Sequence, residues 1–386
     1  MTAKPRKQRP IRRAILTRLG GLFAGSQRNP SRLFLLFNHA VVGGADVVHA
    51  RIAQSVAEVS PWIYLTLPTW PQPFAVNFPA SARLEFVGRR CTGPARRFFH
   101  IGRLAALINA HERPTVLGGN SRFFYELTAL LRPHVRCIDL VHALASVEHF
   151  SLPYAPRLDA RVFINAGVRD DVAAIYDQAG LEPALKQRMR VIENCVDLPP
   201  PPPPKPEGPL RVLYVGRGAP EKRVHLVGRV ASACADAGIA AEFTLVGDVN
   251  ELLDPADRQY CRFTGLLDNP ALIHEHYAAA HVLLLTSRSE GFPVVVMEAM
   301  AHGVVPVCSN VGGMPAHVLP GETGELLPAE EAALVPAAVE ALRNLAADRG
   351  RLAAMAAAAR ARAEQHFTPE RFVGRWRELL LGEGAP

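Results

Sequence analysis

A run of six prolines at residues 199–204 restricts the fold of this chain more than any other feature. Proline fixes φ and has no backbone N–H, so neither a helix nor a central strand can pass through such a run. Consecutive prolines form a stiff, extended polyproline segment instead. We therefore expect residues 198–209 to be a linker that divides the 386 residues into two parts, each long enough for a domain.

Both parts begin with the same pattern of strand, glycine turn and helix. Residues 33–38 form a short apolar run before Gly43 and Gly44, and apolar residues then recur at helical spacing from Asp46. After the prolines, residues 210–215 form a second apolar run before Gly216. Repeated units of this kind build parallel α/β domains, which bind ligands outside the carboxyl ends of their strands. The sequence thus predicts two Rossmann-like, doubly wound domains facing each other across a cleft.

The positive charge of the chain is confined to its N-terminus. The formal net charge is +7, but the first 45 residues hold nine of the 43 Lys and Arg residues and no acid, which leaves 34 basic and 36 acidic residues. This near-neutral remainder argues against nucleic-acid binding. Within the basic extension, 1–30, a helix would place Ile11, Ile15, Leu19 and Leu22 on one face. Such a segment is typical of a peripheral contact with an anionic membrane, and the alternative is a solvated extension.

The cysteines and the apolar runs indicate the compartment. Six cysteines are scattered singly with no metal-site spacing, as expected for free thiols in a reducing cytoplasm. No apolar run reaches the roughly 18 residues that a membrane-spanning helix needs. The N-terminus has no pattern of a cleaved signal peptide. We therefore expect a cytoplasmic protein, either free or peripheral on the inner face of the plasma membrane, and the sequence does not decide whether the basic extension binds the membrane.

A turn at residues 286–293 has the pattern of an anion site. A strand is expected to end at Thr286, Gly291 allows a tight turn, and Pro293 suits the first turn of the next helix. The backbone N–H groups around Gly291 and Phe292 would then belong to a helix start. Such groups, together with the helix dipole, suit a diphosphate.

Two glutamates accompany this turn. Glu290 lies in the turn itself, and Glu298 lies about a turn and a half into the predicted helix. Carboxylates in this position can accept hydrogen bonds from sugar hydroxyls. Each could be an ordinary helix residue if taken singly, but Glu298 is surrounded by apolar residues, which is an unusual place for a solvated acid.

A second glycine-rich segment, 215–222 (VGRGAPEK), follows the first strand after the linker. Glycines beyond a strand allow close backbone approach to a ligand, and Arg217 and Lys222 can bracket a pair of phosphates. The segment is neither a dinucleotide-binding fingerprint nor a P-loop, because the residues after Gly218 fit neither pattern. Taken alone, the two cations would more simply be surface charges.

The C-terminal half resembles the donor domain of glycosyltransferase family 4, a family of retaining enzymes with the GT-B fold. The resemblance rests on successive stretches in register: 191–197 (VIENCVD), 215–222, 290–298 with its two glutamates, 311–315 (VGGMP) and 321–324 (GETG). In the N-terminal half it rests on 43–46 (GGAD) and on Val141-His142. The specific likeness therefore covers roughly residues 190–330.

The resemblance implies a role for each matching residue. Arg217 and Lys222 would neutralise the diphosphate of a nucleotide-sugar donor, Glu290 would hold hydroxyls of the transferred sugar, and Glu298 would bind the ribose. His142 would lie near the sugar. The catalytic set is then Arg217, Lys222, Glu290 and His142, and the donor-binding set is Gly43, Gly44, Gly216, Gly291, Phe292, Pro293 and Glu298.

The resemblance also gives names to the predicted parts of the chain. A basic extension (1–30) precedes an acceptor domain (31–197), the proline-rich linker (198–209) and a donor domain (210–365). The last segment, 366–386, is expected to be a helix that packs back on the N-terminal domain.

The implied activity is retaining, metal-independent transfer of a sugar to a glycan or lipid-linked acceptor, in bacterial polysaccharide, lipopolysaccharide or other glycoconjugate synthesis. No cofactor is implied, and no Asp-x-Asp is present to hold a metal. A soluble acceptor, a related sugar-nucleotide epimerase and a degenerate protein that binds a nucleotide sugar or a partner without turnover are the alternatives. The sequence does not identify the donor base, the sugar, the acceptor or the oligomeric state.

Three departures from the family pattern bear on the donor site. Cys195 and Arg223 stand where the family commonly has glycine, so a positive φ at Cys195 would be strained. Ala316 stands where a glutamate often follows, with His317 after it.

Overall fold

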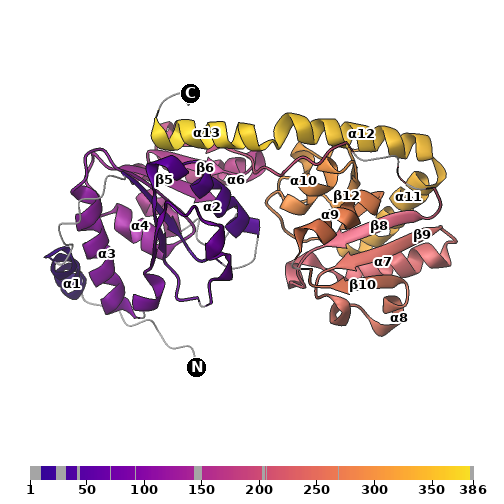
Figure 1. The fold of residues 1–386 in the computed structure, drawn as a ribbon, viewed down its shortest axis with the longest axis horizontal. Helices are drawn as coiled ribbons and strands as arrows, with labels where there is room; N and C mark the ends of the chain where they lie inside the picture. Colours follow the sequence, from indigo (N-terminus) through magenta and orange to yellow (C-terminus); the bar gives the residue numbers. More distant parts are fainter. Residues whose placement is uncertain are drawn as a thin grey trace. The chain divides into compact units, whose positions relative to one another are not determined.

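The structure is a computed structural model that describes residues 10–22, 32–40, 44–69, 71–91, 93–142, 150–201, 205, 207–267 and 269–382. The chain forms two compact units (Figure 1). Unit 1 comprises Met1–Phe163, Arg169–Ile192 and Val373–Pro386, and unit 2 comprises Ile164–Val168 and Glu193–Phe372. Residues 1–9 and 23–30 of the basic extension, residue 31, and 202–204 and 206 of the predicted linker lie outside the described residues.

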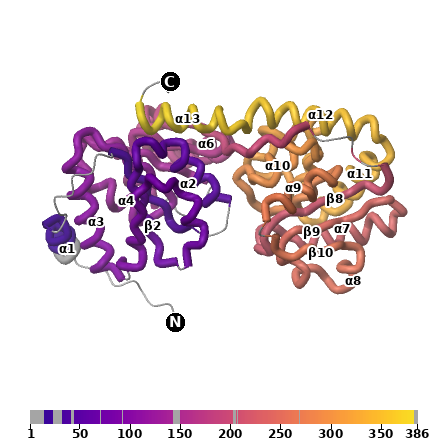
Figure 2. Tube along the Cα trace, in the orientation of Figure 1, coloured from indigo at the N-terminus to yellow at the C-terminus, as the bar shows by residue number. Residues whose placement is uncertain are grey.

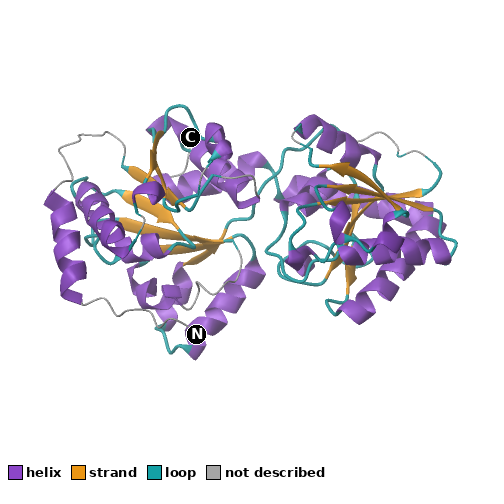
Figure 3. Ribbon diagram, turned by 90° about the horizontal axis from the view of Figure 1, so that it is seen from below, coloured by secondary structure: helices purple, strands orange, loops and turns teal. Residues whose placement is uncertain are grey.

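Unit 1 contains a seven-stranded parallel sheet with helices on both faces (Figure 3). The strand order is β3-β2-β1-β4-β5-β6-β7, so the direction of progression along the sheet reverses between β1 and β4. The strands are β1 (Leu33–Phe37), β2 (Trp62–Leu65), β3 (Arg83–Phe86), β4 (Thr115–Gly118), β5 (Arg136–Val141), β6 (Ala160–Phe163) and β7 (Met189–Val191). The helices are α1 (Pro10–Leu22), α2 (Gly44–Gln54), α3 (Pro94–Asn109), α4 (Arg122–Thr128) and α6 (Ala166–Gln178).

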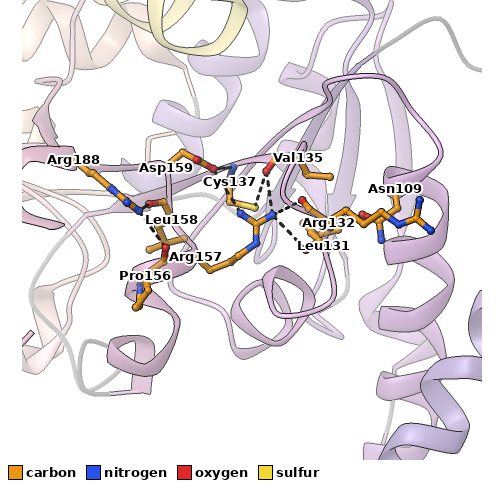
Figure 4. A network of polar contacts seen from close by, with 10 residues as sticks. All are labelled: Asn109, Leu131, Arg132, Val135, Cys137, Pro156, Arg157, Leu158, Asp159 and Arg188. Carbon is orange, nitrogen blue, oxygen red and sulfur yellow. Dashed lines mark hydrogen bonds and ion pairs between the residues drawn. The ribbon is translucent and has the colours of Figure 1, made fainter. Parts of the chain in front are cut away.

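The apolar run that predicts the first strand becomes β1, and all five of its side chains are buried. A central parallel strand is covered on both faces, which is why its sequence is continuously apolar. Arginines fix the loops at the start of β5 and β6 (Figure 4). Arg157 donates to the carbonyl oxygens of Arg132 and Val135, at 2.7 and 3.1 Å, so loop carbonyls that form no ladder bonds are satisfied.

Unit 2 contains a six-stranded parallel sheet in the order β10-β9-β8-β11-β12-β13, which reverses between β8 and β11. The strands are β8 (Leu210–Val215), β9 (Ala241–Val246), β10 (Cys261–Gly265), β11 (Val282–Leu285), β12 (Val305–Ser309) and β13 (Glu325–Leu327). The helices are α7 (His225–Asp236), α8 (Pro255–Arg258), α9 (Pro270–Ala279), α10 (Val294–Ala301), α11 (Glu331–Ala347) and α12 (Arg349–His366). Helix α13 (Pro369–Leu381) follows as the last helix in the chain trace, and it belongs to unit 2 up to Phe372 and to unit 1 from Val373 (Figure 2).

The sheets confirm the predicted fold class of two Rossmann-like halves. Among the helices of the described ranges, none has both the length and the apolar character needed to cross a membrane.

Candidate functional site

Two loops of unit 2 meet at the carboxyl edge of its sheet. One follows β8 and leads through Gly216 to the short 3-10 helix η6 (Pro220–Lys222), and the other follows β11 and runs from Thr286 to Pro293. Because β8 and β11 are adjacent parallel strands at the reversal of strand order, both loops lie at the topological switch point. Open α/β sheets bind their ligands at this position.

An ion pair joins the two loops. Lys222 Nζ lies 2.5 Å from Glu290 Oε1, and the Ser287 hydroxyl donates to the same oxygen at 2.7 Å. Only 20% of the Lys222 side chain and 10% of the Glu290 side chain are exposed. The structure therefore brings together two of the four residues predicted to be catalytic. A partly buried cation held in this way is suited to an anion that enters from the open side.

The buried side chain of Arg223 also links these two loops. Its Nε donates to the Thr286 carbonyl at 2.7 Å and its Nη2 donates to the Ser287 carbonyl at 3.1 Å. The Thr286 hydroxyl donates in return to the carbonyl of Arg223 at 3.0 Å. The backbone of Arg223 has φ of +46°, a conformation that favours glycine. The Arg223 side chain therefore crosslinks the two loops. Its backbone keeps the positive φ that suits the glycine common at this position in family 4.

The glycine pair Gly312–Gly313 supports the turn after Glu290. Gly313 donates its N–H to the carbonyl of Gly291 at 2.5 Å. Gly312 has φ of +56°, and a Cβ there would lie 1.8 Å from the carbonyl oxygen of Glu290. Any side chain at Gly312 would push the turn away, so the backbone of 312–313 sets the position of the candidate donor loop. Phe292, the next residue of the loop, is buried.

Pro293, which was expected in the first turn of the helix, is the N-cap of α10, and the helix begins at Val294. Glu298 lies on the partly buried side of this helix, and its Oε2 accepts a hydrogen bond of 2.9 Å from the Tyr277 hydroxyl. Burial, together with the neighbouring Glu298 carboxylate, raises the pKa of Tyr277 well above its ordinary value, so the tyrosine remains a donor. His302 stacks on Tyr277 with ring centroids 5.1 Å apart. Tyr277 thus fixes the Glu298 carboxylate, a role that no motif in the sequence indicated.

The carboxyl edge of the unit 1 sheet has a separate group of polar residues. A small cavity of about 80 Å³ lies at the reversal between β1 and β4 and is lined by Asn38, His39, Asn120 and His142, among others. His142 Nε2 lies 3.0 Å from His49 Nε2 on α2. Burial lowers the pKa of His142 to about 4, so the ring is neutral at physiological pH.

The remaining predicted residues are placed as follows. Arg217 is exposed on the loop after β8, and Gly216 lies beside Tyr214, whose hydroxyl a Cβ at Gly216 would approach to 2.7 Å. Gly44 is the first residue of α2, and Gly43 lies outside the described residues. Cys195 is buried and is absent from the positive-φ residues of the described ranges, so the strain considered for it does not arise.

Comparison with known proteins gives a context for these loops. Residues 209–348 match the family model of "Glycosyl transferases group 1", a range that includes the loops after β8 and β11. Over the whole chain, the fold is similar to the lipopolysaccharide outer core galactosyltransferase WaaB (TM-score 0.69, 18% identity, 90% of this chain and 99% of that chain). It is equally similar to HepE of Anabaena solved in complex with UDP (TM-score 0.69, 18% identity, 91% and 100% of the two chains). The fold is GT-B.

Sequence relatives of this GT-B chain match it over less than half of its length. A glycogen synthase of Mycobacterium tuberculosis is 31% identical over 179 residues, which cover 43% of this chain and 41% of the synthase. The sulfoquinovosyl transferase SQD2 of Arabidopsis thaliana is 34% identical over 163 residues, which cover 42% of this chain and 31% of that protein. The chain thus spans less than half the length of these curated relatives.

Proposed function

We propose that this GT-B protein is a glycosyltransferase that moves a sugar from a nucleoside-diphosphate sugar to a glycan or lipid-linked acceptor. The observation that carries the proposal is the Lys222–Glu290 pair, which joins two loops at the switch point of unit 2. These loops lie within the residues that match the group 1 glycosyl transferases. The same position supplies a cation, a carboxylate and the start of a helix within one small region.

The proposed roles follow from the charge that develops when the sugar leaves. Cleavage of the glycosyl–phosphate bond gives the sugar oxocarbenium character and adds negative charge to the diphosphate. Lys222, Arg217 and the first N–H groups of α10 would stabilise that negative charge, since fixed cations and helix starts act without reorganisation. Glu290 would then accept hydrogen bonds from the sugar, and Glu298, held by Tyr277, would accept them from the ribose.

The acceptor and the stereochemistry are proposed from the resemblance to family 4. Transfer would proceed with retention and without a metal ion, and Gly43, Gly44 and the neutral His142 of unit 1 would serve the reacting sugar and its acceptor. The proposed setting is bacterial polysaccharide, lipopolysaccharide or glycoconjugate synthesis at the cytoplasmic face of the membrane.

A screen for release of nucleoside diphosphate tests the activity. The purified chain is incubated with UDP-, GDP- and ADP-sugars in the presence of EDTA, and the product is measured by chromatography. We expect slow hydrolysis of the sugars of one nucleotide, because water replaces the missing acceptor. Binding without any release would favour the degenerate protein, and a changed sugar still attached to its nucleotide would favour the epimerase. Either outcome would overturn the proposed transfer.

We also propose that unit 1 attaches to an anionic membrane through α1. This helix lies against α3 at two glycines: a Cβ at Gly20 would lie 2.0 Å from the carbonyl oxygen of Phe99, and one at Gly102 would lie 2.0 Å from that of Thr17. The side that faces away from α3 exposes Ile15 (51%), Leu19 (44%) and Leu22 (81%). Three exposed apolar side chains on one helix face are suited to the acyl boundary of a bilayer.

Unit 1 also has a group of basic residues near β3. A cavity of about 670 Å³ beside β3 is lined by Arg83, Arg89, Arg90 and Arg103, with Glu85 as its one acid. Arg103 follows Gly102, the residue on which α1 lies. Glu85 pairs with Arg83 and Arg103, and Arg89 and Arg90 add further positive charge to this part of unit 1. Arginine side chains are suited to the phosphates of lipid headgroups, so these basic residues are compatible with an anionic membrane.

Flotation with vesicles tests the attachment. Replacing Ile15, Leu19 and Leu22 together by serine should lower the fraction of the full chain bound to vesicles containing phosphatidylglycerol by at least about tenfold, because apolar burial is lost. The triple serine variant of Val76, Leu252 and Leu266, which are exposed elsewhere, is the matched control. Higher salt should weaken binding of the wild type. Equal flotation of the two triple variants would reject α1 as the anchor.

A further inference from the structure

Three metal-ligand side chains gather in unit 2, on elements other than the loop segments that carry Lys222 and Glu290. Within the described residues, Glu193, His317 and His366 each offer one ligand atom, and these three atoms lie within 4.8 Å of one another. His317 Nε2 lies 2.6 Å from Glu193 Oε1, and His366 Nδ1 lies 3.8 Å from Glu193 Oε2. The three residues are far apart in the sequence, so the fold and not a local motif assembles the group.

The three residues come from segments that matter to the architecture. Glu193 is the residue at which the chain passes from unit 1 into unit 2. His366 is the last residue of α12. His317 follows the 3-10 helix η8 (Met314–Ala316), which starts at the glycine pair that supports the candidate donor loop. A metal ion bound by all three would therefore connect the start of the second segment of unit 2, the end of α12 and the residues that support the candidate donor loop.

The surroundings hold the ligands in place. The His317 ring lies between Phe292 and Phe367, with ring centroids 4.8 Å away in both cases. His317 is almost completely buried, whereas 18% of Glu193 and 25% of His366 remain exposed. The site is thus rigid on its inner side and open to solvent on its outer side, where an ion can enter and a water can complete the coordination.

We propose that Glu193, His317 and His366 bind one divalent transition-metal ion, with Zn²⁺ as the best match. Two imidazoles and one carboxylate form a ligand set that zinc favours. Bond lengths of about 2.0–2.2 Å in a tetrahedral site separate the ligand atoms by about 3.4 Å, so the side chains need shifts of only about 1 Å or less. The ion stabilises unit 2 by joining three chain segments. This site is separate from the chemistry of sugar transfer, which needs no metal in our proposal.

Zinc binding to the full chain, freed of any affinity tag and dialysed against EDTA, tests the site. Titration of Zn²⁺ against a chromophoric chelator should show one ion per chain in the wild type. His366→Ala and Glu193→Gln should each weaken binding by at least about 100-fold, since even outer partners of a metal site cost about 10–100-fold. Zinc should also raise Tm of the wild type and not of these variants.

A matched control is the pair of His225 and Glu331, whose Nε2–Oε1 distance is 3.0 Å and which forms no such group of three with any other residue that the structure describes. His225→Ala should bind zinc like the wild type. His366 is partly exposed, so its alanine variant should fold, and the Tm without zinc verifies this. If the wild type bound no zinc, or if all variants bound zinc equally, the three side chains would form ion pairs only. Either result would overturn the metal site. Because no sugar nucleotide is present, the result does not depend on the proposed transfer.

Discussion

Replacement of Lys222 by alanine should lower kcat for sugar transfer by about 10²–10³-fold, the loss typical when one preorganised stabiliser of developing charge is removed. The Nζ of Lys222 is held 2.5 Å from Glu290 in a pair that is largely withdrawn from solvent. In the proposed reaction its charge would therefore act on the leaving diphosphate with little screening by water. Turnover is measured from release of nucleoside diphosphate with the donor that the screen identifies.

Two variants distinguish this effect from a general loss of fold. Lys186 forms a pair of similar geometry with Asp177 at 2.7 Å in unit 1, and Lys186→Ala should leave kcat unchanged. Glu298→Ala should instead raise KM, because a bond to the ribose is made equally in the ground state and in the transition state. Unchanged turnover in Lys222→Ala and unchanged KM in Glu298→Ala would remove the site assignment, provided that both variants keep the Tm of the wild type.

The sequence was sufficient for the fold class because the buried strands are continuous apolar runs. The predicted runs at residues 33–38 and 210–215 become β1 and β8, which lie at the two reversals of strand order. Strands β7 and β13 were not predicted. Both are edge strands of three residues with only one buried side chain each, so neither has a periodic pattern to detect.

Long-range contacts limited the prediction of the site. The strand and glycine turn at 210–216 predicted a following helix but not where it begins. Helix α7 begins only at His225, after Arg223 with its positive φ. The hydrogen bond from Tyr277 to Glu298 joins α9 to α10, and neither residue type indicates that the two side chains meet. The loops that carry Lys222 and Glu290 could be predicted to meet, since both follow strands of one parallel sheet. The crosslinks that fix their distance depend on contacts that only the fold defines.

Replacement of Arg223 by alanine should lower the free energy of unfolding of unit 2 by about 3 kcal/mol. Arg223 is almost completely buried, and its guanidinium donates to the carbonyls of Thr286 and Ser287, which are buried too. Hydrogen bonds from a charged group are worth about 1.5–3 kcal/mol each, and the carbonyls left without a partner add their own desolvation cost. Urea denaturation followed by circular dichroism measures the change, with Arg229→Ala, an exposed arginine of α7, as a control expected to stay within about 0.5 kcal/mol.

Arg223→Gly separates the two properties of this position. Glycine loses the same hydrogen bonds but adopts φ of +46° without strain, whereas alanine keeps the strain of about 1 kcal/mol. Arg223→Gly should therefore be about 1 kcal/mol more stable than Arg223→Ala and still less stable than the wild type. This order of stability is expected only if the hydrogen bonds of the Arg223 side chain compensate for the strain of its backbone at positive φ. An alanine variant as stable as the wild type, or a glycine variant less stable than the alanine one, would show that the crosslink does not hold the two loops together.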